Sequence, residues 1–414
     1  MDSLTHLLVG AATAQLGFRQ KLGRAATWMA VLAAAVPDID IPIGMAVKAL
    51  GYRIEEVAPL LNHRGITHSL LLAPVTALLL SWLWWRRSVG NWARAGAQAP
   101  PPPGPDHAGH PEVVAAQAAA AQRRAEVTAR SRPSFLPRFA CVLLAAITHP
   151  LVDACTSFGT ELFSPLWRER FALHALPPLL DVFFTSIVVL TLAICWFVHR
   201  RASSGEGEQS STGETHSGKM PTPRAGAPRA TVAIAAVGLL LLGSYVAAGR
   251  LFHDRVADLA RQAAAPANTL SADAYPAVGS IFLWRAVVHL DGQWLVARAR
   301  PWYDVATLRA AWKRAPDAND PWIRRAAEIP LVQVYAEAAD GRVRAVSQRD
   351  PNGARIVLFH DMRYGQTLED ANSRWPLHVR FDPKDNKPGK PVNLEAPGSM
   401  LRAVEEAWRE QLRP

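Results

Sequence analysis

Residues 136–157 read LPRFACVLLAAITHPLVDACTS, an apolar run of membrane-spanning length that nevertheless contains His149 and Asp153. A helix needs about 20 mostly apolar residues to cross a bilayer. Five further apolar segments occur in the first 250 residues, so the sequence predicts an α-helical polytopic membrane bundle of about six spans. The six segments cover residues 4–18, 25–47, 66–85, 136–157, 178–198 and 231–249.

The chain changes character after about residue 250. From there on it is charged and rich in Trp, and no run is long enough to span a bilayer. The 414 residues carry 45 Lys and Arg against 35 Asp and Glu, a formal charge of +10, and half of them are apolar. This division excludes a chain that is soluble throughout or embedded throughout. The three cysteines all lie in apolar runs, which excludes a disulfide scaffold and favours small buried hydrophobic side chains.

The charges of the connecting segments predict the orientation in the membrane. Arg19, Lys21 and Arg24 follow the first segment, residues 86–138 hold eight basic residues against three acidic ones, and residues 199–230 hold five against three. Basic connections remain in the cytoplasm. With six spans all three fall on one side, which puts the N-terminus and everything after residue 250 outside. The same anchoring explains the basic balance, so we expect no nucleic-acid partner.

Two of these basic connections differ from their surroundings in composition. Residues 86–135 contain a Pro-rich stretch, and residues 199–230 are rich in Ser, Gly, Thr and Pro, so both are predicted to be poorly ordered cytoplasmic insertions. The first apolar segment is short for a span. It could instead lie flat on the membrane, in which case His6 would be far from the other polar residues described next.

Ionisable residues inside the apolar segments are not scattered. Buried charges in a membrane cost several kcal/mol unless they are paired or liganded. In the six-span arrangement five sequence-distant groups reach one level, near the outer face, as expected where facing helices build a metal site. The prolines beside Asp38 and Asp40 can break their helix and let both carboxylates converge. The groups are Asp2 with His6, Asp38 with Asp40, His63 with His68, His149 with Asp153, and Asp181.

Imidazole with carboxylate favours Zn²⁺, with Fe²⁺ or Mn²⁺ as alternatives, and the number of candidates allows one ion or two. A divalent metal would activate water, and a carboxylate outside the metal site would act as base. Asp40 and Asp181 are the candidates for that catalytic role. Arg64 and Arg170 lie at the same level and could bind an anionic substrate group. The alternatives are structural: Asp2 and Asp181 as helix caps, and the arginines as ion-pair or headgroup anchors.

The order and spacing of these motifs resemble a bacterial family of membrane-bound, metal-dependent hydrolases, the YdjM/YbcI type. The resemblance covers roughly residues 1–200 and rests on the start at Met1–His6, Pro37–Asp40, His63–Ser69, His149–Asp153 with Thr156–Thr160, Arg170–Leu173 and Asp181. It implies an integral protein of the bacterial plasma (inner) membrane and a metal-dependent hydrolase, but supplies no substrate. The metal-site residues that it implies are His6, Asp38, Asp40, His63, His68, His149 and Asp153.

The sequence thus divides into a membrane domain, residues 1–250, and residues 266–414, predicted to form a small β-rich α+β domain outside the membrane. Asp291-Gly292 and Asp340-Gly341 are hairpin signals between apolar runs. The expected strands are Ser280–His289, Gln293–Arg300, Pro330–Ala338, Arg342–Gln348 and Ala354–His360. The expected helices are a stretch at 250–263, residues 301–328 and Leu401–Leu412.

Three functions fit these features. The first is a membrane-bound metallohydrolase near the outer leaflet, acting on a lipid or lipid-linked phosphoester because the site opens at headgroup depth. Peptide hydrolysis is less favoured, since no H-E-x-x-H motif is present. The second is a metal-ion or proton-coupled transporter. The third is a non-catalytic envelope protein with a structural metal, whose outer domain binds a partner.

Overall fold

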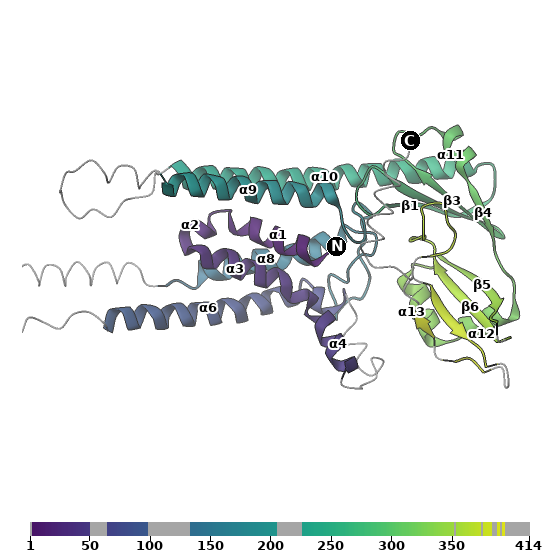
Figure 1. Ribbon diagram of the computed structural model, residues 1–414, viewed down its shortest axis with the longest axis horizontal. Coiled ribbons are helices and arrows are strands. Elements are labelled where there is room, and N and C mark those ends of the chain that lie inside the picture. Colours follow the sequence, from purple (N-terminus) through teal and green to yellow (C-terminus); the bar gives the residue numbers. More distant parts are fainter. Residues whose placement is uncertain are drawn as a thin grey trace, which may run out of the picture.

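The computed structural model describes residues 2–49, 64–97, 133–204 and 226–393, apart from short gaps at 352, 374–375, 383–386 and 390. Two parts lie end to end: a bundle of long helices and a β-rich domain (Figure 1). The helix expected at Leu401–Leu412 and most of the insertion at 86–135 lie outside the described residues.

The bundle reproduces the order of the predicted apolar segments. The second segment is divided by a short 3₁₀ turn, and the third begins with another. The elements are α1 (Ser3–Ala14), α2 (Phe18–Leu22), α3 (Arg24–Ala35), η1 (Val36–Ile39), α4 (Asp40–Ala49), η2 (Ile66–His68), α6 (Leu72–Ala97), α8 (Leu136–Ala154), α9 (Val182–Ser204) and α10 (Gly226–Ala264).

The number of spans differs from the prediction. Four helical segments among the described residues are long and apolar enough to cross a membrane: Arg24–Ile43, Leu136–Ala154, Val182–Ala202 and Arg229–Ala264. The helix α1 has 12 residues and is about 18 Å long, short of a bilayer core of about 30 Å, because the chain turns at Gly17. The helix α6 is long but carries Arg86, Arg87 and Arg94. The bundle is therefore confirmed, whereas six spans are not.

Close packing of α1 against α3 fixes the position of the N-terminal helix. A Cβ atom on Gly10 would lie 2.7 Å from the Cβ of Ala34 and 2.8 Å from the carbonyl oxygen of Ala30, so only glycine allows this approach. At the start of α1, the carboxylate of Asp2 accepts a hydrogen bond from the backbone N–H of Thr5, which caps the helix. The N-terminus lies at the end of the bundle that faces the β-rich domain (Figure 1).

The opposite end of the bundle carries a group of basic residues at its helix ends. The helix α2, which holds Arg19 and Lys21, lies at that end, as do the C-terminal ends of α6 and α9 (Figure 1). The last turns of α9 hold Arg200 and Arg201. The bundle is thus polarised, with positive charge at one end and the β-rich domain at the other.

The helix α10 joins the two parts. Its 39 residues run from the bundle into the β-rich domain, so the expected last span and the expected helical stretch at 250–263 form one helix. At Gly249 a Cβ atom would lie 2.1 Å from the carbonyl oxygen of Ala175, so the loop before α9 packs directly on the α10 backbone. Apolar residues of α10 continue into the core of the first sheet.

Two four-stranded antiparallel sheets make up the β-rich domain. The predicted hairpin around Asp291-Gly292 is confirmed, with Leu290 opposite Gln293. A third strand, which the sequence analysis did not anticipate, precedes the hairpin. A fourth interrupts the stretch expected to be helical at 301–328. The first sheet contains β1 (Thr269–Pro276), β2 (Trp284–Leu290), β3 (Gln293–Ala299) and β4 (Lys313–Pro316), with helices α11 (Val305–Ala311) and α12 (Pro321–Ala327) nearby in sequence.

The second sheet corrects the other predicted hairpin. Pro330–Ala338 is the helix α13, not a strand, because Pro330 suits a helix start and the apolar residues follow a helical period. Gly341 then ends the helix, with φ of 70° and its N–H donating to the carbonyl oxygen of Ala336. The next two strands agree with the predicted runs Arg342–Gln348 and Ala354–His360, whereas the last two strands of this sheet were not anticipated. The sheet contains β5 (Val343–Arg349), β6 (Arg355–Asp361), β7 (Leu377–Arg380) and β8 (Val392–Asn393).

Candidate metal centre

The 3₁₀ turn η1 places two carboxylates around one histidine. Pro37 interrupts the helical hydrogen bonding after α3, and the tighter turn at Val36–Ile39 carries Asp38. His68 ends the short turn η2, which packs against η1. Asp38 faces Nε2 of His68, whereas Asp40 lies on its Nδ1 side. The two carboxylates thus converge on one imidazole from opposite sides.

Two other elements complete the cluster. His149 and Asp153 are four residues apart on one face of α8, and His6 lies on α1. His6, His68, His149 and Asp153 are each at most 1% exposed, whereas the Asp38 side chain retains 15% exposure. Asp38 is therefore the member with access from outside the cluster.

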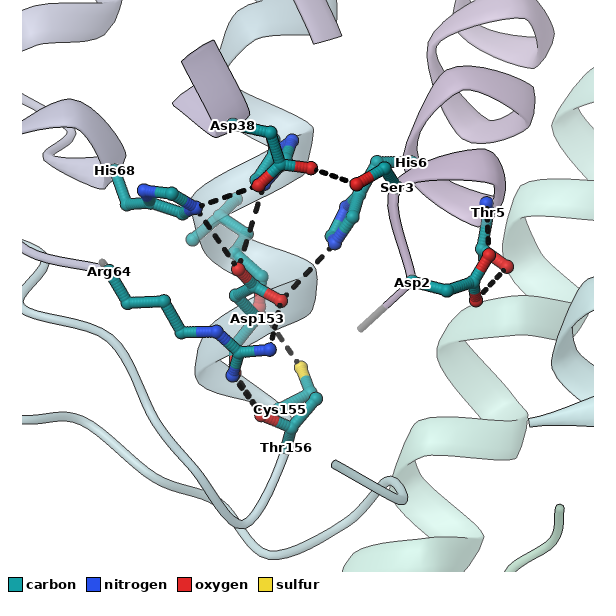
Figure 2. A network of polar contacts seen from close by, with 12 residues as sticks. Asp2, Ser3, Thr5, His6, Asp38, Arg64, His68, Asp153, Cys155 and Thr156 are labelled. Carbon is teal, nitrogen blue, oxygen red and sulfur yellow. Dashed lines mark hydrogen bonds and ion pairs between the residues drawn. The ribbon is translucent and has the colours of Figure 1, made fainter. Parts of the chain in front are cut away.

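The facing atoms are separated by nearly constant distances. Asp38 Oδ1 lies 3.3 Å from His68 Nε2 and 3.4 Å from His149 Nε2. Asp153 Oδ2 lies 3.6 Å from each of the same two nitrogens. His6 Nε2 is 3.2 Å from the other oxygen of Asp153 (Figure 2). The donor atoms form two overlapping sets. One contains Asp38, His68 and His149, and the other contains His6, His149 and Asp153.

These separations are longer than typical hydrogen bonds and match those between neighbouring ligands of a metal ion. N–H···O hydrogen bonds are about 2.7–3.2 Å long. Around a tetrahedral ion with bonds of about 2.0–2.2 Å, neighbouring ligand atoms lie about 3.3–3.6 Å apart. The four contacts that join Asp38 and Asp153 to His68 and His149 fall in this second range.

Hydrogen bonds outside the cluster fix which nitrogen of each histidine can bind a metal. His149 Nδ1 lies 2.6 Å from the carbonyl oxygen of Ala34, which can only accept, so Nδ1 carries a proton and, in the neutral ring, Nε2 presents its lone pair. Thr67 donates its hydroxyl proton to Asp40 at 2.9 Å and therefore accepts from His68 Nδ1 at 3.0 Å. Nε2 of His68 likewise presents a lone pair. Such orientation by outer partners is typical of metal-binding histidines.

His6 is held differently. Its ring stacks on that of His149 at 3.7 Å between centroids, and Nε2 contacts Asp153. Nδ1 is buried and makes no hydrogen bond with any described residue. Ser3, on the same helix, donates to the second oxygen of Asp38 at 2.5 Å. The start of α1 thus contributes to the cluster, although α1 is short.

Arg64 contacts the cluster directly. Its guanidinium is 3.2 Å from Asp153 Oδ1 and donates to the hydroxyl of Thr156 at 2.8 Å (Figure 2). The residue is 4% exposed and has a left-handed φ of 66°. Arg170 lies farther out, 3.9 Å from Glu161, and its guanidinium stacks on Phe158. Arg64 is therefore an ion-pair partner of a candidate ligand, as its structural alternative predicted.

Three predicted site residues are not among the facing donor atoms. Asp40 lies behind His68, in the position of an orienting carboxylate, and Asp181 accepts hydrogen bonds from the backbone N–H of Phe184 and from Tyr245, both at 2.9 Å. Neither carboxylate belongs to the two donor sets of the described residues. Asp181 and Asp2 instead occupy cap positions. His63 lies outside the described residues.

Some contributors were predicted and others were missed. Thr67 donates to Asp40 and Thr156 accepts from Arg64, whereas Thr148 bonds its own helix at the carbonyl oxygen of Ala145. Ser3 and the carbonyl oxygen of Ala34 were not anticipated. Ser3 adjoins the Asp2–His6 motif and could have been considered. The carbonyl has no side-chain signal, so only packing of α8 against α3 identifies it.

A family comparison covers the part of the chain that contains this cluster. The model of the family described as YdjM inner membrane protein matches residues 1–256. The chain belongs to the YdjM inner membrane protein family. No curated protein and no solved structure matches it. The part shared with the YdjM family ends inside α10, so it contains the whole cluster and leaves out the β-rich domain.

Proposed function

We propose that this YdjM-family protein is a membrane-bound metal-dependent hydrolase. Asp38, His68, His149 and Asp153 hold a divalent metal, with zinc the preferred ion, and His6 lies beside it on the second oxygen of Asp153. The observation that carries the proposal is the set of four N···O separations of 3.3–3.6 Å between two carboxylates and two imidazoles whose other nitrogens face hydrogen-bond partners outside the cluster. Iron and manganese accept the same donors.

Some residues of the cluster bind the metal, and others position those ligands. A bound divalent ion supplies Lewis acidity and lowers the pKa of water. Thr67 and Asp40 keep His68 in its metal-binding tautomer, and Ala34 does the same for His149. Arg64 offsets the negative charge of Asp153 by contacting Oδ1, which leaves Oδ2 facing His68 and His149. Asp38 is the most exposed ligand of the set, with 15% of its side chain exposed.

The substrate class follows from where the cluster lies. It sits at the bundle end next to the β-rich domain, and the basic helix ends lie at the other end. Because basic ends favour the cytoplasm, we propose that the N-terminus and the β-rich domain face the outside of a bacterial inner membrane. The centre is then near the headgroups of the outer leaflet. Together with Arg64 and Arg170, this depth supports a lipid or lipid-linked phosphoester as substrate.

Metal content tests the centre. The full chain, purified in mild detergent without a His-tag, should contain one or two equivalents of zinc, iron or manganese by elemental analysis. The double variant His68→Ala/His149→Ala should lose it. His253→Ala is a matched control, because this buried histidine lies on α10 outside the cluster. Wild-type protein that binds no metal even after reconstitution would overturn the proposal and favour proton-coupled transport or a structural role.

Turnover tests the hydrolase itself. Release of 4-nitrophenol from 4-nitrophenyl octyl phosphate should depend on added metal and disappear in the same double variant. His253→Ala should keep the rate of the wild type. Stoichiometric metal with no turnover on this diester, on phosphatidic acid vesicles or on a carboxylic ester would contradict the enzymatic assignment, and a structural metal would then explain the ligands.

A further inference from the structure

A cavity of about 380 Å³ lies between the helical bundle and the β-rich domain. The bundle contributes Arg64, Phe158 and Leu179, and the β-rich domain contributes Tyr335 and Ala338 of α13 together with Arg363. Cavities that bind small organic ligands have volumes of about 300–1,000 Å³ and mostly apolar walls with a few placed polar groups. This cavity has both properties.

Arg64 connects the cavity to the candidate metal centre. Its guanidinium lines the cavity and is 3.2 Å from Asp153 in the cluster. The Nε atom of the same side chain is buried and makes no hydrogen bond with any residue that the structure describes. Arg64 and Asp153 therefore separate a ligand in the cavity from the proposed metal, and a donor of Arg64 at that boundary lacks an acceptor among the described residues.

The charges around the cavity favour an anion. Arg64 and Arg170 lie over Phe158, at 4.9 and 5.1 Å from the ring centroid. Arg363 adds a third guanidinium from the β-rich domain. Asp361, the acidic residue of the lining, accepts from both the backbone N–H and the side chain of Arg363. Its charge is therefore largely engaged, which leaves the lining with a net positive charge.

The β-rich domain is attached where it closes this cavity. Arg363 donates to the carbonyl oxygen of Ser157 in the bundle and to that of Ala338 at the end of α13. The same side chain thus ties the loop after α8, the helix α13 and the strand β6 together. Removing the domain would remove one wall of the cavity while leaving the metal ligands in place.

We propose that this cavity is the substrate chamber of the metal centre and that the β-rich domain supplies half of it. Its ligand is an amphipathic anion, a phosphoester whose negative group lies at Arg64 and whose apolar chain lies along Phe158, Leu179 and Ala338. This inference rests on the proposed function for the identity of the reacting group. The chamber itself is defined by the lining and does not require the metal.

Binding of octyl phosphate tests the chamber. The full chain in phosphatidylcholine nanodiscs is titrated calorimetrically, with empty nanodiscs as baseline, and elemental analysis follows metal content in each sample. Ala338→Trp places an indole in the cavity, and we expect at least tenfold weaker binding with unchanged metal. Ala336→Trp is the matched control, since Ala336 is on the same helix, is also half-buried and does not line the cavity. If Ala338→Trp fails to fold, Leu179→Trp fills the cavity from the bundle side.

The outcomes separate this inference from the proposed function. Octyl phosphate binding that Ala338→Trp and Leu179→Trp leave unchanged, or that Ala336→Trp weakens equally, overturns the chamber even if the metal is present. If octanol binds as tightly as octyl phosphate, the cavity does not recognise an anionic group. If inorganic phosphate binds as tightly, the cavity does not recognise an apolar chain. Selective loss in Ala338→Trp from a protein without metal would uphold the chamber and reject the hydrolase.

Discussion

Two buried clusters of histidine and aspartate in this protein have similar composition and different geometry. The metal-centre cluster contains Asp38, His68, His149 and Asp153, whose facing atoms are 3.3–3.6 Å apart. The junction cluster lies where α10 meets β1. There His253 Nε2 is 2.8 Å from Asp273, and Asp273 also accepts from Tyr275 at 3.1 Å and Arg342 at 2.9 Å. The second set of distances is that of ordinary hydrogen bonds.

The difference in distances distinguishes the proposed metal site from a structural network of hydrogen bonds. In the junction cluster each oxygen of Asp273 is saturated by donors of the protein itself, so nothing further is required. In the metal-centre cluster two carboxylates face the Nε2 atoms of two histidines at 3.3–3.6 Å, which is longer than most hydrogen bonds. Burial of such groups is costly unless another positive charge joins them. Composition therefore does not distinguish the two clusters, whereas the distances and the hydrogen-bond partners do.

The same substitution in both clusters should give the largest contrast. Asp153→Asn removes a charge and a ligand oxygen that faces His68 and His149, so we expect metal content to fall at least tenfold. Asp273→Asn should leave metal content at the wild-type value. Elemental analysis of the two variants measures this directly. Metal retained in Asp153→Asn, or lost in Asp273→Asn, would contradict the distinction between the clusters.

The stability of the fold should depend on the junction cluster. Asp273→Asn leaves the buried His253 and the partly buried Arg342 beside a neutral amide, and breaking a buried ion pair on one side costs about 3 kcal/mol. We expect the free energy of unfolding to decrease by about that amount in thermal or denaturant unfolding. Asp254→Asn is the control, because Asp254 also contacts His253 but is 50% exposed and should cost less than about 1 kcal/mol. Equal losses in the two variants would contradict a structural role for the junction cluster.

Much of the metal-centre cluster could be predicted from sequence because its signals are local. His149 and Asp153 share a helix face by their four-residue spacing, and the prolines beside Asp38 indicated the break that η1 confirms. Membrane segments also make each polar residue conspicuous, since buried charge is costly there. The separate roles of Asp38 and Asp40 could not be predicted, because they depend on which nitrogen of His68 each carboxylate faces.

The β-rich domain was less predictable because its signals are ambiguous. Asp340-Gly341 resembles a hairpin turn, yet here it ends the helix α13. A short apolar run beside a glycine has the same appearance in both structures. The junction cluster escaped detection for a different reason: His253 and Asp273 are 20 residues apart on a helix and a strand, and no spacing rule connects them.

A smaller effect on metal affinity is expected from Asp40, which lies on the Nδ1 side of His68. Asp40→Asn weakens the acceptor that holds the Thr67 hydroxyl and, through it, the Nδ1 proton of His68. Loss of such an outer carboxylate typically weakens metal affinity about 10–100-fold. A chelator competition titration measures the dissociation constant in wild type and variant. Full loss of metal would mean that Asp40 is itself a ligand, and no change would mean that His68 needs no orientation.

The smallest effect concerns pH and the ring of His174, which stacks on His253 at 5.2 Å in the junction cluster. Burial lowers the pKa of His174 to about 4, since the charged ring is desolvated; Asp273 opposes this effect, while His253, Arg342 and Arg363 reinforce it. An unfolded histidine has a pKa of about 6.5. The unfolded chain therefore binds this proton first, and the stability contribution that is complete above about pH 6.5 is lost as the pH falls toward 4.

His174→Asn should remove that loss without straining the backbone, because the φ of 52° suits asparagine. We expect the stability of the wild type to decrease between pH 7 and pH 4 by on the order of 1–3 kcal/mol more than that of the variant. The comparison is made in the Asp153→Asn background, because metal release would otherwise overlap the same pH range. His360 is also buried with a pKa lowered to about 4, so only the difference between the two proteins reports on His174. Parallel stability curves would mean that His174 is protonated without cost, and the junction cluster would then tolerate a charge that its burial should exclude.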